Sequence, residues 1–218
     1  MYIMNNKNYI IEAKHISKKY GNRTILEDIS FRFQSGHAYG IVGGNGSGKT
    51  VLLKCICGFV KSDGGNILIN GKRLEKKVLL GAGIMIESPG FLENWNAYNN
   101  LEFLYSIRNR KKDKEHLCTV LKKVGLNPKS RMQVGKYSLG MKQRLALAQA
   151  IMEEPDVLIL DEPMNNLDND TAEKMRELFC KMKTEGKLII LSSHIQKDID
   201  SICDEVFELE SGKLNRIC

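Results

Sequence analysis

Long apolar segments are absent from this chain of 218 residues. A helix that crosses a bilayer needs about 18 or more consecutive apolar residues, and Lys54 interrupts the best candidate run. The first ten residues, MYIMNNKNYI, also lack the basic start, apolar centre and small-residue cleavage site of a signal peptide. We therefore expect no membrane span and no secretory leader, so that any work at a membrane is done from the cytoplasm.

Patterns that hold a metal or a disulfide framework are missing as well. The six cysteines show neither C-x-x-C spacing nor a His/Cys metal-binding pattern, and Cys55 and Cys57 fall in an apolar stretch that predicts core positions. There is no internal repeat, low-complexity segment or long heptad array. One globular domain with a subdomain is therefore the expected organisation.

Acidic residues are in the minority, and the net charge is +7. Basic clusters occur at residues 72–73 with 76–77, and at residues 108–114. Clusters of this kind could face anionic lipid headgroups or nucleic acid. An ordinary solvated, lysine-rich face is the alternative, and we favour it.

One octet carries clear chemistry: GGNGSGKT at residues 43–50 matches the phosphate-binding pattern G-x-x-x-x-G-K-[ST]. Residues 38–42 have the pattern of a buried strand and residues 51–57 that of a helix, which is the context the loop requires. Glycines let successive N–H groups turn toward phosphate oxygens, and the helix start adds partial positive charge. A flexible surface loop would lack this context. The residues expected to bind the phosphates are Gly43, Gly44, Asn45, Gly46, Ser47, Gly48, Lys49 and Thr50.

Two residues of the octet have particular roles. Lys49 would reach the β- and γ-phosphates, and Thr50 would offer its hydroxyl to Mg²⁺. We therefore predict a nucleoside triphosphate site. Together with six cysteines that show no metal or disulfide pattern, such a site indicates a reduced, cytosolic protein.

Strand and helix patterns alternate along the chain. Short strands are predicted at residues 10–14, 29–33 and 67–69. Continuous apolar runs at 157–160 and 187–191 are typical of parallel strands buried on both faces. Between them lies the spacing of an amphipathic helix, formed by Met175, Leu178, Phe179 and Met182. Residues 88–135 begin with a Pro89-Gly90 turn and then show helical spacing.

The predicted fold is therefore α/β: a P-loop NTPase core with a mostly parallel sheet, an N-terminal antiparallel β subdomain and an inserted helical subdomain. We expect a single domain at residues 1–218. The core and β subdomain would occupy about 1–87 and 146–218, and the helical subdomain about 88–145.

Asp161 and Glu162 follow the strand at 157–160. A strand that ends in carboxylates at the carboxyl edge of the sheet places them beside the phosphate loop. Asp161 suits water-mediated Mg²⁺ binding, and Glu162 suits either a general base or a water-positioning role at the γ-phosphate. An apolar run that ends in Asp-Glu is common by itself, and a strand that enters a solvated loop would look the same.

Several segments resemble motifs of the ATP-binding-cassette (ABC) ATPases. Residues 137–144, YSLGMKQR, are similar to the signature motif, usually L-S-G-G-Q, a variable residue and Q-R. Residues 163–168, PMNNLD, resemble the D-loop, and residues 192–194, SSH, the switch histidine. Tyr20-Gly21 resembles the aromatic A-loop that stacks on adenine. The resemblance extends from about residue 10 to residue 215, in the order and approximate spacing of the family.

This resemblance implies a head-to-tail homodimer that encloses two ATP molecules with Mg²⁺. Each site would join the glycine loop of one copy with Ser138 and Gly140 of the other, and Asp168 would line the seam. His194 would sense the γ-phosphate and help to hold the attacking water. Taken alone, His194 and Tyr20 would be ordinary structural residues. An integral membrane permease would be the partner, with this chain peripheral on the inner face of the membrane.

Three positions depart from the family pattern. Glu87 stands where a glutamine is usual, and its carboxylate could coordinate Mg²⁺. Leu139 replaces the first glycine of the signature, and Met141 replaces its glutamine.

A narrower likeness involves residues 87–101 together with the signature. They are similar to the ATPase subunits of bacterial bacitracin and lantibiotic-immunity exporters, which also carry glutamate at the position of Glu87. This likeness implies export of a peptide antibiotic or another amphipathic compound. An ABC ATPase that acts as an assembly scaffold is the alternative. Genome-maintenance and ribosome-acting relatives need a long coiled coil or two cassettes, which this chain lacks, so we expect no nucleic-acid partner.

Overall fold

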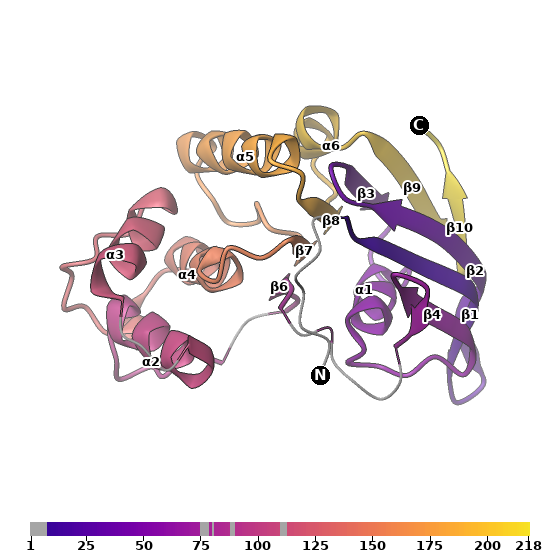
Figure 1. Ribbon diagram of the computed structural model, residues 1–218, viewed down its shortest axis with the longest axis horizontal. Coiled ribbons are helices and arrows are strands. Elements are labelled where there is room, and N and C mark those ends of the chain that lie inside the picture. Colours follow the sequence, from indigo (N-terminus) through magenta and orange to yellow (C-terminus); the bar gives the residue numbers. More distant parts are fainter. Residues whose placement is uncertain (1–7, 75–78, 80, 88–89, 110–112) are drawn as a thin grey trace.

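A computed structural model describes residues 8–74, 79, 81–87, 90–109 and 113–218 (Figure 1). Residues 76–77, Pro89 and most of the basic cluster that begins at residue 108 lie outside the described side chains. Within the described part of the chain, no helix is long and apolar enough to cross a membrane.

An antiparallel sheet forms the N-terminal portion. Its described strands are β1 (Ile10–Tyr20), β2 (Arg23–Gln34), β4 (Gly64–Ile69) and β5 (Lys72–Arg73), in the order β2-β1-β4-β5. The strand predicted at 10–14 is longer than predicted and continues to Tyr20. Its second half is not evident from the sequence because a bulge interrupts the alternation of apolar and polar residues. His15 has a φ of 54°, and the register shifts between Ala13 and Ile16. Beyond the bulge the apolar residues change phase, so the sequence pattern resembles a strand end.

The second sheet is the nucleotide-binding core. Its described strands have the order β10-β9-β3-β8-β7-β6. They are β3 (Ala38–Val42), β6 (Gly83–Met85), β7 (Val157–Asp161), β8 (Leu188–Ser192), β9 (Glu205–Glu210) and β10 (Lys213–Arg216). All pairings are parallel except that of β10 with β9. The carboxyl ends of β3, β7 and β8 therefore meet at one edge.

Helices cover this sheet and extend to one side of it (Figure 1). They are α1 (Lys49–Cys57), α2 (Ala97–Asn109), α3 (Lys114–Lys123), α4 (Leu139–Ile151), α5 (Asn169–Thr184) and α6 (Gln196–Ile202), with a 3₁₀ turn, η1 (Val134–Lys136). The helices α2, α3 and α4 lie together on the side away from the antiparallel sheet. The predicted α/β fold with its inserted helical segment is confirmed. The boundary at residue 145 stays a prediction, and α4 runs across it.

Two hydrophobic cores meet at β7. Leu158 and Leu160 pack with the helical side, whereas Val157 and Ile159 pack with α1 and the antiparallel sheet. Successive side chains of a strand point to opposite faces, so a continuous apolar run supplies both cores. The same alternation holds in β8, and these two buried strands fix the position of the residues that follow them.

Candidate active site

The octet predicted to bind phosphate forms the loop between β3 and α1. Gly43 and Gly48 have φ of 148° and 108°, a region that favours glycine. A Cβ atom at Gly43 would lie 2.4 Å from the carbonyl oxygen of Leu209, and one at Gly48 would lie 2.9 Å from Ile25 Cγ2. The glycines are therefore required by conformation and by space.

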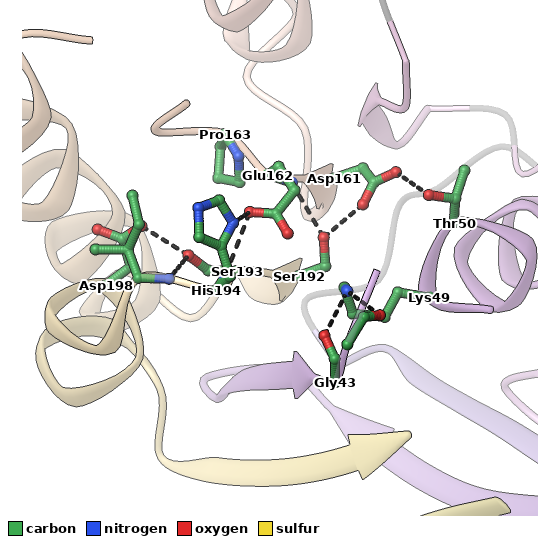
Figure 2. A network of polar contacts seen from close by, with 12 residues as sticks. Gly43, Lys49, Thr50, Asp161, Glu162, Pro163, Ser192, Ser193, His194 and Asp198 are labelled. Carbon is green, nitrogen blue, oxygen red and sulfur yellow. Dashed lines mark hydrogen bonds and ion pairs between the residues drawn. The ribbon is translucent and has the colours of Figure 1, made fainter. Parts of the chain in front are cut away.

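Lys49 begins α1 and is only 8% exposed. Its Nζ donates to the carbonyl oxygens of Gly43 and Gly44, at 2.7 and 3.2 Å, and Figure 2 shows the side chain folded back over the loop. The hydroxyl of Ser47 is buried and has no hydrogen-bond partner among the described residues. A buried hydroxyl without a partner and a buried ammonium in the same loop suit phosphate oxygens.

A cavity of about 450 Å³ opens beside this loop. Residues 45–51 line it together with Arg23, Ile25, Met85, Glu87, Gln143, Asp161, Glu162, Asn165 and Asn166. Its size lies within the range of roughly 300–1,000 Å³ that is typical of small-molecule sites. Strands, the first turn of α1 and the loop after β7 thus contribute to one site.

Asp161 ends β7 and is held from two sides. The hydroxyl of Thr50 donates to Oδ2 at 2.6 Å, and the hydroxyl of Ser192 donates to Oδ1. A hydroxyl and a carboxylate in contact are the hard oxygen donors that Mg²⁺ prefers. Within the described residues, no group of three His, Cys, Asp or Glu side chains could hold a metal alone. These two residues therefore fit an ion whose remaining ligands are phosphate oxygens and water.

Glu162 contacts His194 directly. The carboxylate Oε2 lies 2.8 Å from Nδ1 of His194, and the backbone N–H of His194 donates to the same oxygen at 3.3 Å. Glu162 has a φ of 48°, and its own N–H donates to the carbonyl and hydroxyl oxygens of Ser192 at 3.1 and 3.0 Å. Backbone held in this region is strained and needs support from its surroundings.

Gln143, to which no role was assigned from the sequence, also supports the backbone of Glu162. From α4, its Nε2 donates to the carbonyl oxygens of Glu162 and Pro163, at 2.9 and 3.0 Å. The only sequence signal is its place in the signature segment. The signature helix therefore fixes the backbone of the residue proposed as the base.

The signature serine lies elsewhere. Ser138 is the exposed N-cap of α4 and accepts a hydrogen bond from the N–H of Met141 at 3.3 Å. A Cβ at Gly140 would lie 2.5 Å from the carbonyl oxygen of Asn166, so this position requires glycine. Neither Ser138 nor Gly140 is among the described residues that line the cavity beside Lys49. The first N–H groups of a helix have no partner within the helix, so they can donate to another molecule.

Asp168 caps α5 by accepting from the N–H of Thr171 at 2.9 Å, and it pairs with Arg144. The backbone and side-chain donors of Thr171 hold the pKa of Asp168 below its usual value. These contacts are within the chain, so the structure shows a local role for Asp168 beside the predicted one at a dimer seam.

Tyr20 and Glu87 lie at the margins of the site. Tyr20 is 52% exposed and stands opposite Arg23, which lines the cavity, while Nζ of Lys18 lies 5.2 Å from its ring centre. Glu87 also lines the cavity, but its carboxylate pairs with Nζ of Lys54 at 2.6 Å. No sequence pattern predicts this pairing, which partly neutralises the charge that Glu87 offers to a metal.

Comparisons with known proteins agree with this geometry. The family described as ABC transporter matches residues 26–165. The ABC transporter ATP-binding protein YybJ of Bacillus subtilis is 39% identical over 94% of both chains. The lantibiotic transport ATP-binding protein SrtF of Streptococcus pyogenes is 33% identical over 94% of this chain and 89% of its own length. The bacitracin transport ATP-binding protein BcrA of Bacillus licheniformis is 37% identical over 94% of this chain and 68% of its own.

Solved structures share the fold. A dimeric bacterial ABC transporter cassette has a TM-score of 0.86 at 22% identity, with 94% of this chain and 97% of the other covered. The ATP-binding subunit of an ABC transporter has a TM-score of 0.84 at 27% identity, with 95% and 90% covered. With its phosphate loop, its paired acids and these relatives, the chain belongs to the ABC transporter family and is one of its ATP-binding ATPases.

Proposed function

We propose that this ATPase powers export of a peptide antibiotic of the bacitracin or lantibiotic kind, or of another amphipathic compound, through a separate membrane subunit. Relatives named for lantibiotic and bacitracin transport match 94% of this chain, which supports the proposal. In this proposal the chain is peripheral on the cytoplasmic face of the membrane, bound to its permease.

The observation that carries the catalytic part is the contact of Glu162 with His194 beside the cavity that Lys49 lines. Glu162 takes the proton of the attacking water, and His194 orients the carboxylate and the γ-phosphate. Lys49 exchanges its loop carbonyls for phosphate oxygens. Thr50 and Asp161 hold Mg²⁺, which neutralises phosphate charge when it is bound. Tyr20 stacks on the base.

A head-to-tail homodimer completes the site. Ser138 and Gly140 lie outside the cavity of their own chain, and a second copy would bring them to the γ-phosphate. The hydroxyl of Ser138 and the N–H groups at the start of α4 are suitable donors for that group. The exposed side chain of Leu139 would then contact the partner.

Inactivation of the protein in its host, together with a search for its membrane partner, tests the export proposal. We expect cells that carry Lys49→Ala to become sensitive to bacitracin or to a lantibiotic, and the tagged wild-type chain to bring down an integral membrane protein from detergent-solubilised membranes. An exposed lysine away from the cavity, Lys61→Ala, is the control. The chain does not serve an exporter if cells with Lys49→Ala stay as resistant as wild type and no membrane protein copurifies with a wild-type chain that hydrolyses ATP normally.

Glu87→Gln tests the carboxylate that departs from the family pattern. We expect a higher Mg²⁺ concentration for half-maximal ATPase activity, since an amide attracts a cation less than a carboxylate does. Because Lys54 pairs with Glu87 in this structure, the shift should be about twofold to threefold, and Lys54→Met should move it in the opposite direction. A Mg²⁺ dependence that neither variant changes would assign Glu87 to the loop surface only.

A further inference from the structure

Few charged side chains are buried in the part of the chain that the structure describes: they are those of Lys49, Arg176 and Asp198. Lys49 belongs to the phosphate loop, whereas Arg176 and Asp198 pair with each other between α5 and α6. A buried ion pair loses hydration and often stabilises a fold less than apolar residues of the same volume would. Stability alone is therefore a poor account of this pair.

The two oxygens of Asp198 have different partners. Oδ1 accepts from Nε and Nη2 of Arg176, at 2.8 and 2.7 Å. Oδ2 accepts from the hydroxyl of Ser193 at 2.8 Å, and Ser193 directly precedes His194 (Figure 2). The carboxylate of Asp198 thus joins helix α5 to the loop that carries the histidine.

Arg176 is itself fixed from its other side. Its Nη1 donates to Oε2 of Glu173 at 2.9 Å, and Nζ of Lys197 contacts the same oxygen at 2.6 Å. Two cations and two carboxylates from α5 and α6 therefore balance, and no net charge is buried. These contacts hold the guanidinium of Arg176 in place, so that its ion pair with Asp198 is kept.

The hydroxyl of Ser193 also controls the backbone on the far side of the histidine. It accepts a hydrogen bond from the N–H of Ile195 at 3.0 Å. The hydroxyl of Ser193 therefore links the residues on either side of His194. His194 itself contacts Glu162 through Nδ1 and its backbone N–H. If Ser193 moved, the contact between His194 and Glu162 would lengthen.

We propose that Arg176 and Asp198 are positioning residues for hydrolysis, which hold His194 against Glu162 through the hydroxyl of Ser193. The inference rests on the proposed role of His194. Lys49, Thr50 and Asp161 make separate contacts, so a change in this network should slow the chemical step and leave nucleotide binding intact. Small misplacement of catalytic groups is enough for such an effect.

Ser193→Ala tests the network without unpairing the buried charges. We expect kcat to fall about tenfold while KM and the affinity for a non-hydrolysable ATP analogue stay within about twofold. Ser193→Thr, which keeps the hydroxyl, should recover the rate. Asp198→Asn should lower kcat to the same extent and also lower the melting temperature. Asp200→Asn, the same substitution at an exposed position of α6 that makes no contact with Arg176 or Ser193 among the described residues, is the matched control and should keep kcat.

A double-mutant cycle with His194→Ala separates positioning from general damage. In single-turnover hydrolysis, Ser193→Ala should cause no further loss once His194 is gone. An unchanged kcat in Ser193→Ala, when His194→Ala is strongly slowed but still measurable in single turnover, overturns the inference and leaves the role of His194 in place. A loss that persists in the His194→Ala background, or that comes with weaker nucleotide binding, also overturns it. Full activity of His194→Ala overturns both proposals.

Discussion

Lys49→Ala is expected to abolish ATP hydrolysis. The ammonium now donates to the carbonyls of Gly43 and Gly44 and would turn to phosphate oxygens. Hydrogen bonds to charged groups contribute about 1.5–3 kcal/mol, so nucleotide affinity should fall roughly 10- to 150-fold. Affinity is measured by isothermal titration calorimetry and hydrolysis by phosphate release. The control Lys61→Ala should behave as wild type, and wild-type hydrolysis by Lys49→Ala would refute the assignment of the phosphate site.

Glu162→Gln should separate binding from hydrolysis. The amide keeps the shape of the side chain and can still accept from Nδ1 of His194, but it cannot take a proton. Turnover should therefore fall at least about 100-fold, the lower bound for loss of a general base, while ATP remains bound.

The trapped nucleotide should also hold two copies of the chain together. We expect an ATP-dependent dimer of Glu162→Gln in size-exclusion chromatography with Mg²⁺, and a monomer without nucleotide. Glu177→Gln, an exposed acid on α5, is the matched control for loss of one negative charge. Undiminished turnover by Glu162→Gln would show that another group activates the water.

Local patterns were sufficient for much of the fold. The phosphate loop with β3 and α1, and the buried strands β7 and β8, follow from glycine spacing and continuous apolar runs. Each of these signals lies within a few consecutive residues, so it can be recognised in the sequence without knowledge of the fold. The extension of β1 past His15 was missed because its bulge breaks the alternation on which the strand prediction depends.

Contacts between distant segments were not predictable in the same way. Gln143 reaches the backbone of Glu162, Ser192 donates to Asp161, and Lys54 pairs with Glu87. These pairs are separated by 19, 31 and 33 residues, and each depends on how strands and helices pack. No spacing rule relates such residues, because side chains from different elements meet only after the sheet has formed. The same applies to the pair of Arg176 with Asp198.

Each ATP site should draw on two chains, and a mixing experiment tests this arrangement most directly. Lys49→Ala and Ser138→Arg should each be inactive alone. In a heterodimer, the intact phosphate loop of the Ser138→Arg chain meets the intact signature of the Lys49→Ala chain. An equal mixture contains about half heterodimers, each with one of two sites restored, so about a quarter of wild-type activity is expected. Activity no higher than that of the two separate proteins would contradict the head-to-tail site.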